Sequence, residues 1–275
     1  MNYMTRLVCL VFLLFVSAEL KADGYPWLTD ARAHDSLLKG FETPRHFERV
    51  LVPPSSFAAF MRSLPLKSAD ADLKTFDGRV LTRHFAAAIV DLDIGSKDLQ
   101  QCADTLIRLY AEYAFSKAET GNLVFKFTSG DPFAYRNYLQ GKRPVVRGNK
   151  VAWKQTPAQK HTRQSFSKWL DIIFTYAGTA SLARDLKAVS FSNAQIGDLF
   201  ITAGFPGHTV MIADMAVNAA GVRRVLLVQG YTPAQSAHIV FNRNEGSAWH
   251  ILEQDKPLNI GFWQFEVSSL RRFFD

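Results

Sequence analysis

Residues 197–241 read GDLFITAGFPGHTVMIADMAVNAAGVRRVLLVQGYTPAQSAHIVF, and this stretch decides the fold. It contains short runs rich in β-branched and aromatic residues, and glycine, proline or asparagine turns separate them. The runs cover 198–202, 208–214, 224–229 and 237–241. Such a succession of short strands predicts an antiparallel meander. Together with helices earlier in the chain, the meander indicates an α+β fold.

The helices that would cover this sheet lie earlier in the sequence. The clearest runs from Leu99 to about Phe115, where apolar residues recur at three- and four-residue steps and Asp98 precedes them as a cap. Cys102 lies on the inward face of this helix. Further helices are predicted over 55–62, 165–177 and 179–186, and strands over 85–94 and 123–128. Residues 129–159, with their glycines, prolines and basic residues, are expected to form an inserted loop region.

The N-terminus has the pattern of a secretory signal peptide. Arg6 precedes an unbroken apolar run over 7–16, and small residues follow it. The run is too short to span a bilayer comfortably, so cleavage is expected. We therefore predict a signal peptide over 1–22, an extended lead-in over 23–54 and a single α+β domain over 55–275. The mature protein is expected in the periplasm or secreted, without an integral membrane segment.

Composition argues against a nucleic-acid partner. The formal net charge is +7, but the positive residues are scattered apart from a basic stretch over 140–150. A nucleic-acid-binding protein concentrates such charge along one face or groove. In an exported protein, attraction to anionic cell-wall polymer or lipid headgroups explains the charge equally well. The hydrophobic share of 48%, with 22 phenylalanines, is ample for a core.

Cys102 is the only cysteine that remains after removal of the signal peptide. A lone thiol in an exported protein cannot form an intramolecular disulfide, so it is a buried core residue, an intermolecular linker or a reactive group. A position near a helix start lowers a thiol pKa and favours the reactive group. A cysteine on an inward helix face is more often a small core residue, and both interpretations stay open.

A cysteine nucleophile needs an imidazole to take its proton and a third group to orient the ring. His208 follows a Gly-Phe-Pro-Gly turn and opens a strand, so it is the candidate base. The short turn at 218–221 folds the next strand back, and Gln229 or Tyr231 then lies opposite His208, depending on register. Gln229 is the better acceptor for a ring N–H, and His238 on a later strand is a second candidate.

The other polar residues have weaker cases. Asp214 shares the face of His208 but lies roughly 20 Å along the strand, too far to orient the ring. Gln101 and Asp104 flank Cys102 and, with Tyr231, are candidate substrate-binding residues. The sequence has no HExxH pattern, close histidine pair or cysteine cluster, so we expect no metal site, and no cofactor is indicated.

Several motifs in combination resemble one exported bacterial family that is known only as a domain of unknown function. The motifs are DLQQCAD at 98–104, YAGTASL at 176–182, Gly-Asp at 197–198 with PGH at 206–208, and YTPAQ at 231–235. The resemblance runs from about Pro53 to the C-terminus and implies no particular activity.

More distantly, the order of a helix-borne cysteine, a Gly-Asp pair, a strand-borne histidine and a polar residue on the next strand is similar to papain-like cell-wall amidases of the NlpC and CHAP type. This resemblance implies a papain-like core with an insertion between Phe115 and Phe191, Cys102 as nucleophile and His208 as base. We therefore expect an exported thiol hydrolase, a peptidase or amidase, that cleaves an amide bond in cell-wall peptide. The alternative is a non-enzymatic envelope module that binds glycan or a protein partner.

Overall fold

The computed structural model describes residues 25–28 and 35–273. The expected signal peptide over 1–22 lies outside the described residues. Within the part that is described, none of the helices combines the length and the apolar character needed to cross a membrane.

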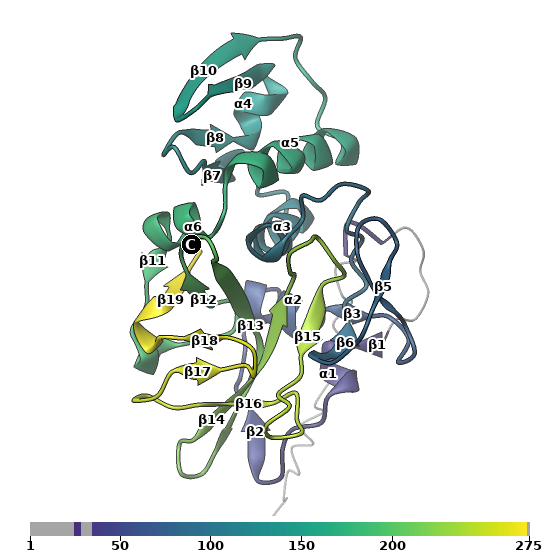
Figure 1. Cartoon of the computed structure of the whole chain (residues 1–275), viewed down its shortest axis with the longest axis vertical. Helices are drawn as coiled ribbons and strands as arrows, with labels where there is room; N and C mark the ends of the chain where they lie inside the picture. The colour runs from purple at the N-terminus through teal and green to yellow at the C-terminus, as the bar shows by residue number, and fades with distance from the viewer. Residues whose placement is uncertain (1–24, 29–34, 274–275) are drawn as a thin grey trace, which may run out of the picture.

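A nine-stranded antiparallel sheet forms the centre of the molecule (Figure 1). Its strands run in the order β11-β19-β12-β13-β14-β15-β6, while β2 pairs with β13 and β16 with β14. The bounds are β2 Phe47–Arg49, β6 Ala86–Ile89, β11 Lys187–Ala188, β12 Leu199–Thr202, β13 His208–Asn218, β14 Arg223–Gln229, β15 His238–Val240, β16 His250–Leu252 and β19 Leu270–Arg272. The stretch β12–β15 is the meander predicted from the sequence, so the mixed α+β class is confirmed.

Six α-helices accompany the sheet within the described residues. They are α1 Leu37–Gly40, α2 Phe57–Arg62, α3 Cys102–Ser116, α4 Tyr135–Leu139, α5 Arg163–Tyr176 and α6 Thr179–Asp185. The sequence offers Ser55 or Ser56 as the cap of α2, and the structure uses Ser56, whose hydroxyl accepts the Ala59 N–H. The central helix α3 contacts both β13 and β14, and its fully buried Leu106, Ile107 and Leu109 join the main core.

Helix α3 begins at Cys102 and not at Leu99. Gln101 is the N-cap residue with an extended backbone, and its N–H donates to the Asp104 carboxylate at 3.1 Å. Asp98 does not cap the helix, because its carboxylate accepts the backbone N–H of Ala234 at 2.7 Å. Cys102 is therefore the first helical residue instead of lying one turn in, and the positive end of the helix dipole acts on it directly.

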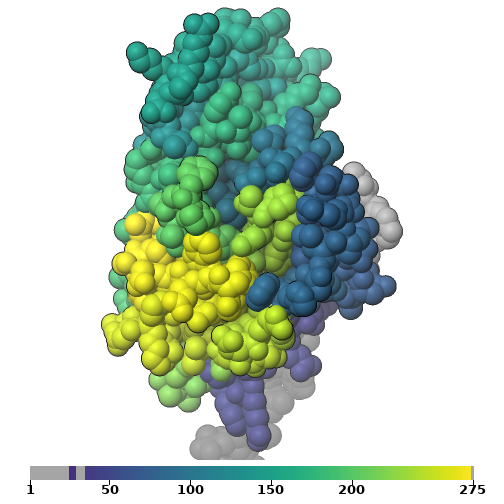
Figure 2. Space-filling model, viewed as in Figure 1, coloured from purple at the N-terminus to yellow at the C-terminus, as the bar shows by residue number. Residues whose placement is uncertain are grey.

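The region expected to be a loop, 129–159, is instead largely regular structure. A hairpin of β7 (Val124–Lys126) and β8 (Pro132–Ala134) leads into α4, and a second hairpin joins β9 (Lys142–Arg147) to β10 (Lys150–Gln155). With α5 these elements form one end of the molecule, at the top of Figures 1 and 2. The basic residues of β9 and β10 obscured the apolar pattern of a strand, so this hairpin was not predicted. Across it, the Lys142 ammonium lies 4.3 Å from the Trp153 ring centroid.

The expected extended lead-in also contributes to the fold. Residues 35–54 contain β1 (Asp35–Ser36), α1 and β2, and Leu37 is fully buried in the main core. Short two-stranded pairs complete the structure: β1 with β3 (Pro65–Leu66), β4 (Leu73–Lys74) with β5 (Val80–Leu81), and β17 (Leu258–Asn259) with β18 (Gln264–Phe265). In Figure 2 the C-terminal segment (yellow) borders the blue surface of residues before 100, and Phe262 packs on Phe85 at 4.5 Å between ring centroids.

Candidate functional site

Three buried polar side chains form a hydrogen-bonded chain across adjacent strands, which we call the histidine relay: His208, Gln229 and His238. His208 opens β13, Gln229 ends β14 and His238 opens β15. His208 Nε2 lies 2.7 Å from Gln229 Oε1, and Gln229 Nε2 lies 2.8 Å from His238 Nε2. His238 Nδ1 lies 2.9 Å from the backbone carbonyl oxygen of Ser236. The relay contains no acidic or permanently charged side chain, and each of its three members forms a hydrogen bond within the described structure.

Strand register explains why these residues meet. The β13–β14 ladder pairs Met211 with Val228, so its continuation places Tyr231 opposite His208 and Gln229 on the diagonal of the same face. The rings of His208 and Tyr231 are 5.2 Å apart, edge to face. Both residues that the sequence left open therefore contact His208, one through its ring and the other through a hydrogen bond.

Asp214 does not share the face of His208, contrary to the sequence expectation. A β-bulge between Ile212 and Asp214 inserts one residue and reverses the alternation of side chains. The carboxylate of Asp214 lies on the opposite face, where it accepts from Arg49 Nε at 2.6 Å and Arg62 Nε at 2.7 Å. Asp214 is thus the anchor of a buried ion-pair cluster.

The thiol of Cys102 lies where the first turn of α3 meets β13. Burial, followed by the nearby Asp104 carboxylate, raises the pKa of Cys102 to about 11. The backbone N–H groups of Ala103, of Cys102 itself and of Thr209 oppose this shift. Thr209 directly follows His208 in the chain. Because burial also lowers the pKa of His208 to about 4, both groups are neutral at pH 7.

Cys102 and His208 lie near the start of β13, on opposite faces of the sheet. A Cβ on Gly230 would lie 2.2 Å from Thr105 Oγ1 and 2.8 Å from the Gln101 carbonyl oxygen, so α3 packs directly on the Gly230 backbone. Side chains alternate along an extended strand, which puts Gln229 on the other face. The last ladder pair at this end joins Met211 to Val228. No hydrogen bond among the described residues joins the Cys102 thiol to His208; the thiol meets the backbone of Thr209 instead.

Two of the sequence motifs are held together by side-chain bonds. The Asp98 carboxylate accepts the Ala234 backbone N–H at 2.7 Å and the Gln101 side-chain N–H at 2.9 Å. The Gln101 amide oxygen accepts the Thr232 hydroxyl at 3.1 Å. Gln101 therefore positions the 231–235 loop against the start of α3. Asp104, in the first turn of α3, is buried and accepts the N–H of the N-cap residue Gln101. Burial raises the pKa of its carboxyl well above the ordinary value.

Aromatic rings surround His208. Tyr231, Phe262 and Trp263 are partly exposed, while Phe265 is buried, and their ring centroids lie 5.2 to 6.0 Å from that of His208. Phe205, in the turn before His208, is fully exposed. Sequence reasoning placed Tyr231 near His208 and took Trp263 only as a core or groove aromatic residue. It did not bring Phe262 or Trp263 to His208, because no local pattern links the C-terminal segment to β13.

Some buried polar atoms beside Cys102 have no hydrogen-bond partner within the described structure. They include Asp104 Oδ1, Thr105 Oγ1 and Thr209 Oγ1. All three residues belong to the first turn of α3 or the start of β13. Buried polar groups are normally paired, so this junction keeps unused hydrogen-bonding capacity next to the thiol.

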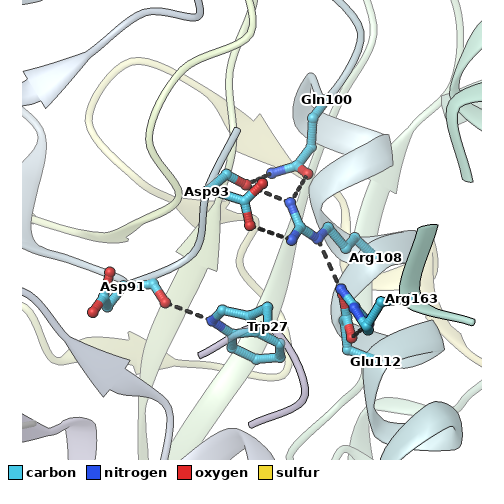
Figure 3. A network of polar contacts seen from close by, with 7 residues as sticks. All are labelled: Trp27, Asp91, Asp93, Gln100, Arg108, Glu112 and Arg163. Atoms are coloured by element: carbon cyan, nitrogen blue, oxygen red, sulfur yellow. Dashed lines mark hydrogen bonds and ion pairs between the residues drawn. The ribbon is translucent and has the colours of Figure 1, made fainter. Parts of the chain in front are cut away.

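A second polar network lies further along α3 (Figure 3). We call it the Arg108 cluster; its members are Asp93, Gln100, Arg108, Glu112 and Arg163. Arg108 donates to the Asp93 carboxylate at 2.6 Å, to the Asp93 carbonyl and to Gln100 Oε1 at 2.6 Å. Fully buried Glu112 accepts from Arg163 at 2.6 and 2.7 Å and from Arg108 at 3.4 Å. In the described part of the chain, no three His, Cys, Asp or Glu side chains are grouped to hold a metal ion.

Comparison with known proteins gives a family and no activity. No curated protein and no solved structure matches the chain. The model of the family described as Domain of unknown function (4846) matches residues 37–272. The match starts before the point at Pro53 expected from the motifs, and it includes α1 and β2. Because it covers most of the sequence, the chain belongs to the family Domain of unknown function (4846).

Proposed function

We propose that this protein is an exported cysteine hydrolase that cleaves an amide bond in cell-wall peptide. In this proposal Cys102 is the nucleophile, His208 is the general base and then the general acid, and Gln229 orients the ring. The observation that carries it is the 2.7 Å bond between His208 Nε2 and Gln229 Oε1, at the end of β13 where the thiol of Cys102 meets the Thr209 N–H. Nucleophilic cysteine chemistry needs such an oriented imidazole.

The reaction starts from neutral groups. Because Cys102 and His208 lie on opposite faces of the sheet, the proposal routes the thiol proton through one water molecule to His208 Nδ1. Cys102 Sγ attacks the amide carbonyl carbon as this proton leaves, so a tetrahedral oxyanion and an imidazolium form together. The C–N bond then breaks, and the amine leaves with the proton from His208. Water attacks the resulting thioester, again with His208 as base, and the carboxylic acid and the free thiol are released.

The first turn of α3 supplies the electrostatic part of this proposal. The first backbone N–H groups of a helix have no partner inside the helix, and they carry the positive end of its dipole. At Cys102 and Ala103 they already favour the thiolate. The same groups would stabilise the oxyanion that forms next to the sulfur.

The substrate class and location belong to the same proposal. They are supported by the signal-peptide pattern in the first 22 residues and by the resemblance to NlpC- and CHAP-type amidases. In a papain-like arrangement, the region between Phe115 and Phe191 would be an insertion. Partly exposed Tyr231 and Trp263 beside His208 offer apolar faces on which a peptide or a sugar ring would pack.

A non-enzymatic envelope module is the second candidate. It is favoured by the low exposure of Cys102, 8%, and by the partly exposed rings of Tyr231, Phe262 and Trp263 around His208. Such a module would bind glycan or a protein partner through these rings. It predicts that Cys102 is dispensable and that binding is lost when Tyr231 or Trp263 becomes alanine.

Digestion of purified muropeptides separates the two candidates. Wild-type protein is expected to release products visible by mass spectrometry, and Cys102→Ala to lose at least about a thousandfold in rate, since the nucleophile is gone. Lys97→Ala, which changes an exposed residue, is the activity control. If both the wild type and Cys102→Ala bind the muropeptides without cleaving them, the hydrolase proposal is wrong and the binding module stands.

Alkylation of the thiol tests its state without a substrate. Iodoacetamide should label Cys102 slowly at pH 7 and about tenfold faster for each pH unit, until the rate levels near the thiol pKa of about 11. Peptide mapping assigns the label to residue 102. A folded protein that resists labelling even at pH 11 would have a sealed core cysteine, and that result contradicts the proposal.

A further inference from the structure

We infer that His238 is a positioning residue that sets the tautomer of His208 through the amide of Gln229. This inference rests on the proposed role of His208 as the base, since the tautomer decides which ring nitrogen can take a proton. The relay is anchored at one end by a backbone carbonyl, which cannot turn over or change its protonation. The position of every hydrogen along the relay follows from that anchor.

The first link is Ser236 to His238. A carbonyl oxygen only accepts hydrogen bonds, so His238 Nδ1, 2.9 Å from the Ser236 oxygen, must carry a proton. His238 is 2% exposed, and burial lowers its pKa to about 4. The ring is therefore neutral at pH 7, and its Nε2 has a lone pair and no proton.

The second link fixes the amide of Gln229. His238 Nε2 can only accept, so the Gln229 atom 2.8 Å away must be the NH₂ group. The amide oxygen then points the other way, toward His208. Without His238, the two orientations of this amide would differ only in how they suit His208. The histidine on β15 selects between them.

The third link fixes His208. Gln229 Oε1 accepts, so His208 Nε2, at 2.7 Å, carries the proton of the neutral ring. His208 Nδ1 is then the unprotonated nitrogen, ready to take a proton from a thiol. When the ring becomes an imidazolium, the bond from Nε2 to Gln229 is kept. The relay thus holds one tautomer before the reaction and stabilises the ion formed during it.

Loss of His238 has a specific consequence. In His238→Phe the ring volume stays but the acceptor is gone, so the Gln229 amide can turn and present its NH₂ group to His208 Nε2. That orientation requires the proton on Nδ1, which removes the base. A purely structural role for His238 would change stability without changing the tautomer of His208.

The experiment is nitrogen NMR of protein labelled with ¹⁵N-histidine, at pH 7, where ring-nitrogen shifts and two-bond couplings report each tautomer. The wild type is expected to show His208 with the proton on Nε2 and His238 with the proton on Nδ1. His238→Phe should give His208 as a mixture of tautomers. His238→Gln offers an oxygen to the Gln229 NH₂ group and should restore the single tautomer.

His250→Phe is the matched control. His250 is a buried histidine of β16 that bonds the Val240 carbonyl and has no hydrogen bond to the relay, so its loss should leave His208 unchanged. A wild-type His208 protonated on Nδ1 overturns the inference, and so does a His238→Phe variant that keeps Nε2–H alone. If His238→Phe does not fold, His238→Leu serves in its place, and the wild-type spectrum is decisive against the inference on its own.

The readout needs no substrate, so it is independent of the hydrolase proposal. If the protein shows the predicted tautomers but does not cleave muropeptides, the hydrolase proposal is wrong and the role of His238 stands. If cleavage depends on Cys102 but the tautomer of His208 is unchanged in His238→Phe, the hydrolase proposal stands and the role of His238 is wrong. Where cleavage is observed, His238→Phe should lower kcat with little change in KM, because the tautomer affects the chemical step.

Discussion

The histidine relay and the Arg108 cluster are both polar networks beside α3, but they differ in charge and in exposure. The relay is buried, whereas the Asp93 side chain of the Arg108 cluster is 68% exposed. The Arg108 cluster consists mostly of charged groups, and both oxygens of Glu112 are bonded to arginine (Figure 3). The relay contains no group that is charged at pH 7, and unpaired polar atoms such as Thr209 Oγ1 lie next to it.

The difference follows from the cost of desolvation. A buried charge is stable only with a counter-charge and complete hydrogen bonding, and the carboxylate of Glu112 has both through Arg108 and Arg163. A neutral imidazole is buried at much smaller cost and keeps a free lone pair. The contrast supports two proposals: that the Arg108 cluster holds α3 in place, and that the relay serves the chemistry proposed for Cys102.

The two networks should respond to different ranges of pH. The loss of stability between pH 7 and pH 4, which comes from the relay, is the largest effect we expect. Burial lowers the pKa of His208 and of His238 from 6.5 to about 4. The unfolded chain therefore binds more protons below pH 6.5, so stability is complete above that pH and falls as the pH drops toward 4. The expected loss is roughly 3 kcal/mol for each histidine. Urea unfolding between pH 7 and pH 4 measures it.

The Arg108 cluster should respond only in stronger acid. Arg108 contributes to holding the pKa of Asp93 below its ordinary value, so that contribution is present above about pH 4 and is lost only below it. His238→Phe should flatten the slope between pH 6.5 and 4. Because the raised pKa of Asp104 adds stability as the pH falls, the comparison between the two proteins is the test. A wild type whose stability falls no more steeply between pH 6.5 and 4 than that of His238→Phe would contradict the neutral relay.

Glu112→Gln should be the next largest effect, and it acts on the other network. The substitution leaves Arg108 and Arg163 without their shared buried carboxylate, and breaking a buried pair of this kind costs about 3–5 kcal/mol. The control is Glu119→Gln, since Glu119 is exposed just beyond α3. Unfolding midpoints in urea measure the difference. Equal midpoints for the two variants would mean that the Arg108 cluster does not hold the helix.

Gly230→Ala should disturb the junction between the networks. The added Cβ would lie 2.2 Å from Thr105 Oγ1, which forces the first turn of α3 away from β14. Overpacking of this kind costs about 1–3 kcal/mol, and iodoacetamide should label Cys102 faster because the thiol becomes less buried. Gly121→Ala, where a Cβ meets nothing within 4 Å, is the control. Unchanged labelling would show that α3 does not need this close approach.

Lys97→Ala should give the smallest effect. Lys97 pairs with Asp171 at 2.9 Å, but the side chains are 65% and 43% exposed, and water screens such a pair. The unfolding midpoint should not move measurably, in contrast to Glu112→Gln. A shift in the unfolding midpoint comparable to that of Glu112→Gln would mean that this exposed ion pair stabilises the fold as much as the buried one.

Much of the sheet could be predicted from local patterns. The β12–β15 meander, the turn at 218–221 and the Ser56 cap of α2 follow from alternation and turn chemistry. The prediction was wrong where those patterns were interrupted. Basic residues at the ends of both strands, with Pro144 inside β9, hid β9 and β10. The extra residue of the bulge before Asp214 reversed a face that simple alternation assigned.

The candidate site was predictable in part, for a physical reason. Residue chemistry and the hairpin turn were enough to pair His208 with Gln229, since partners across a short turn are local in sequence. Spacing alone could not give the helix start at Cys102, because Asp98 is used by Ala234, more than a hundred positions along the chain. The same holds for Phe262 and Trp263, which reach His208 from the C-terminal segment.

The sequence by itself determined the α+β class, the order of the strands in the meander and the residue types available for chemistry, because these depend on neighbours a few positions apart. Only the tertiary structure decided that Cys102 begins its helix against Gly230, that His238 bonds Gln229 and that Asp214 belongs to a structural ion pair. These facts depend on register, a bulge and helix packing, which bring together groups far apart in the chain and set the burial that controls their protonation.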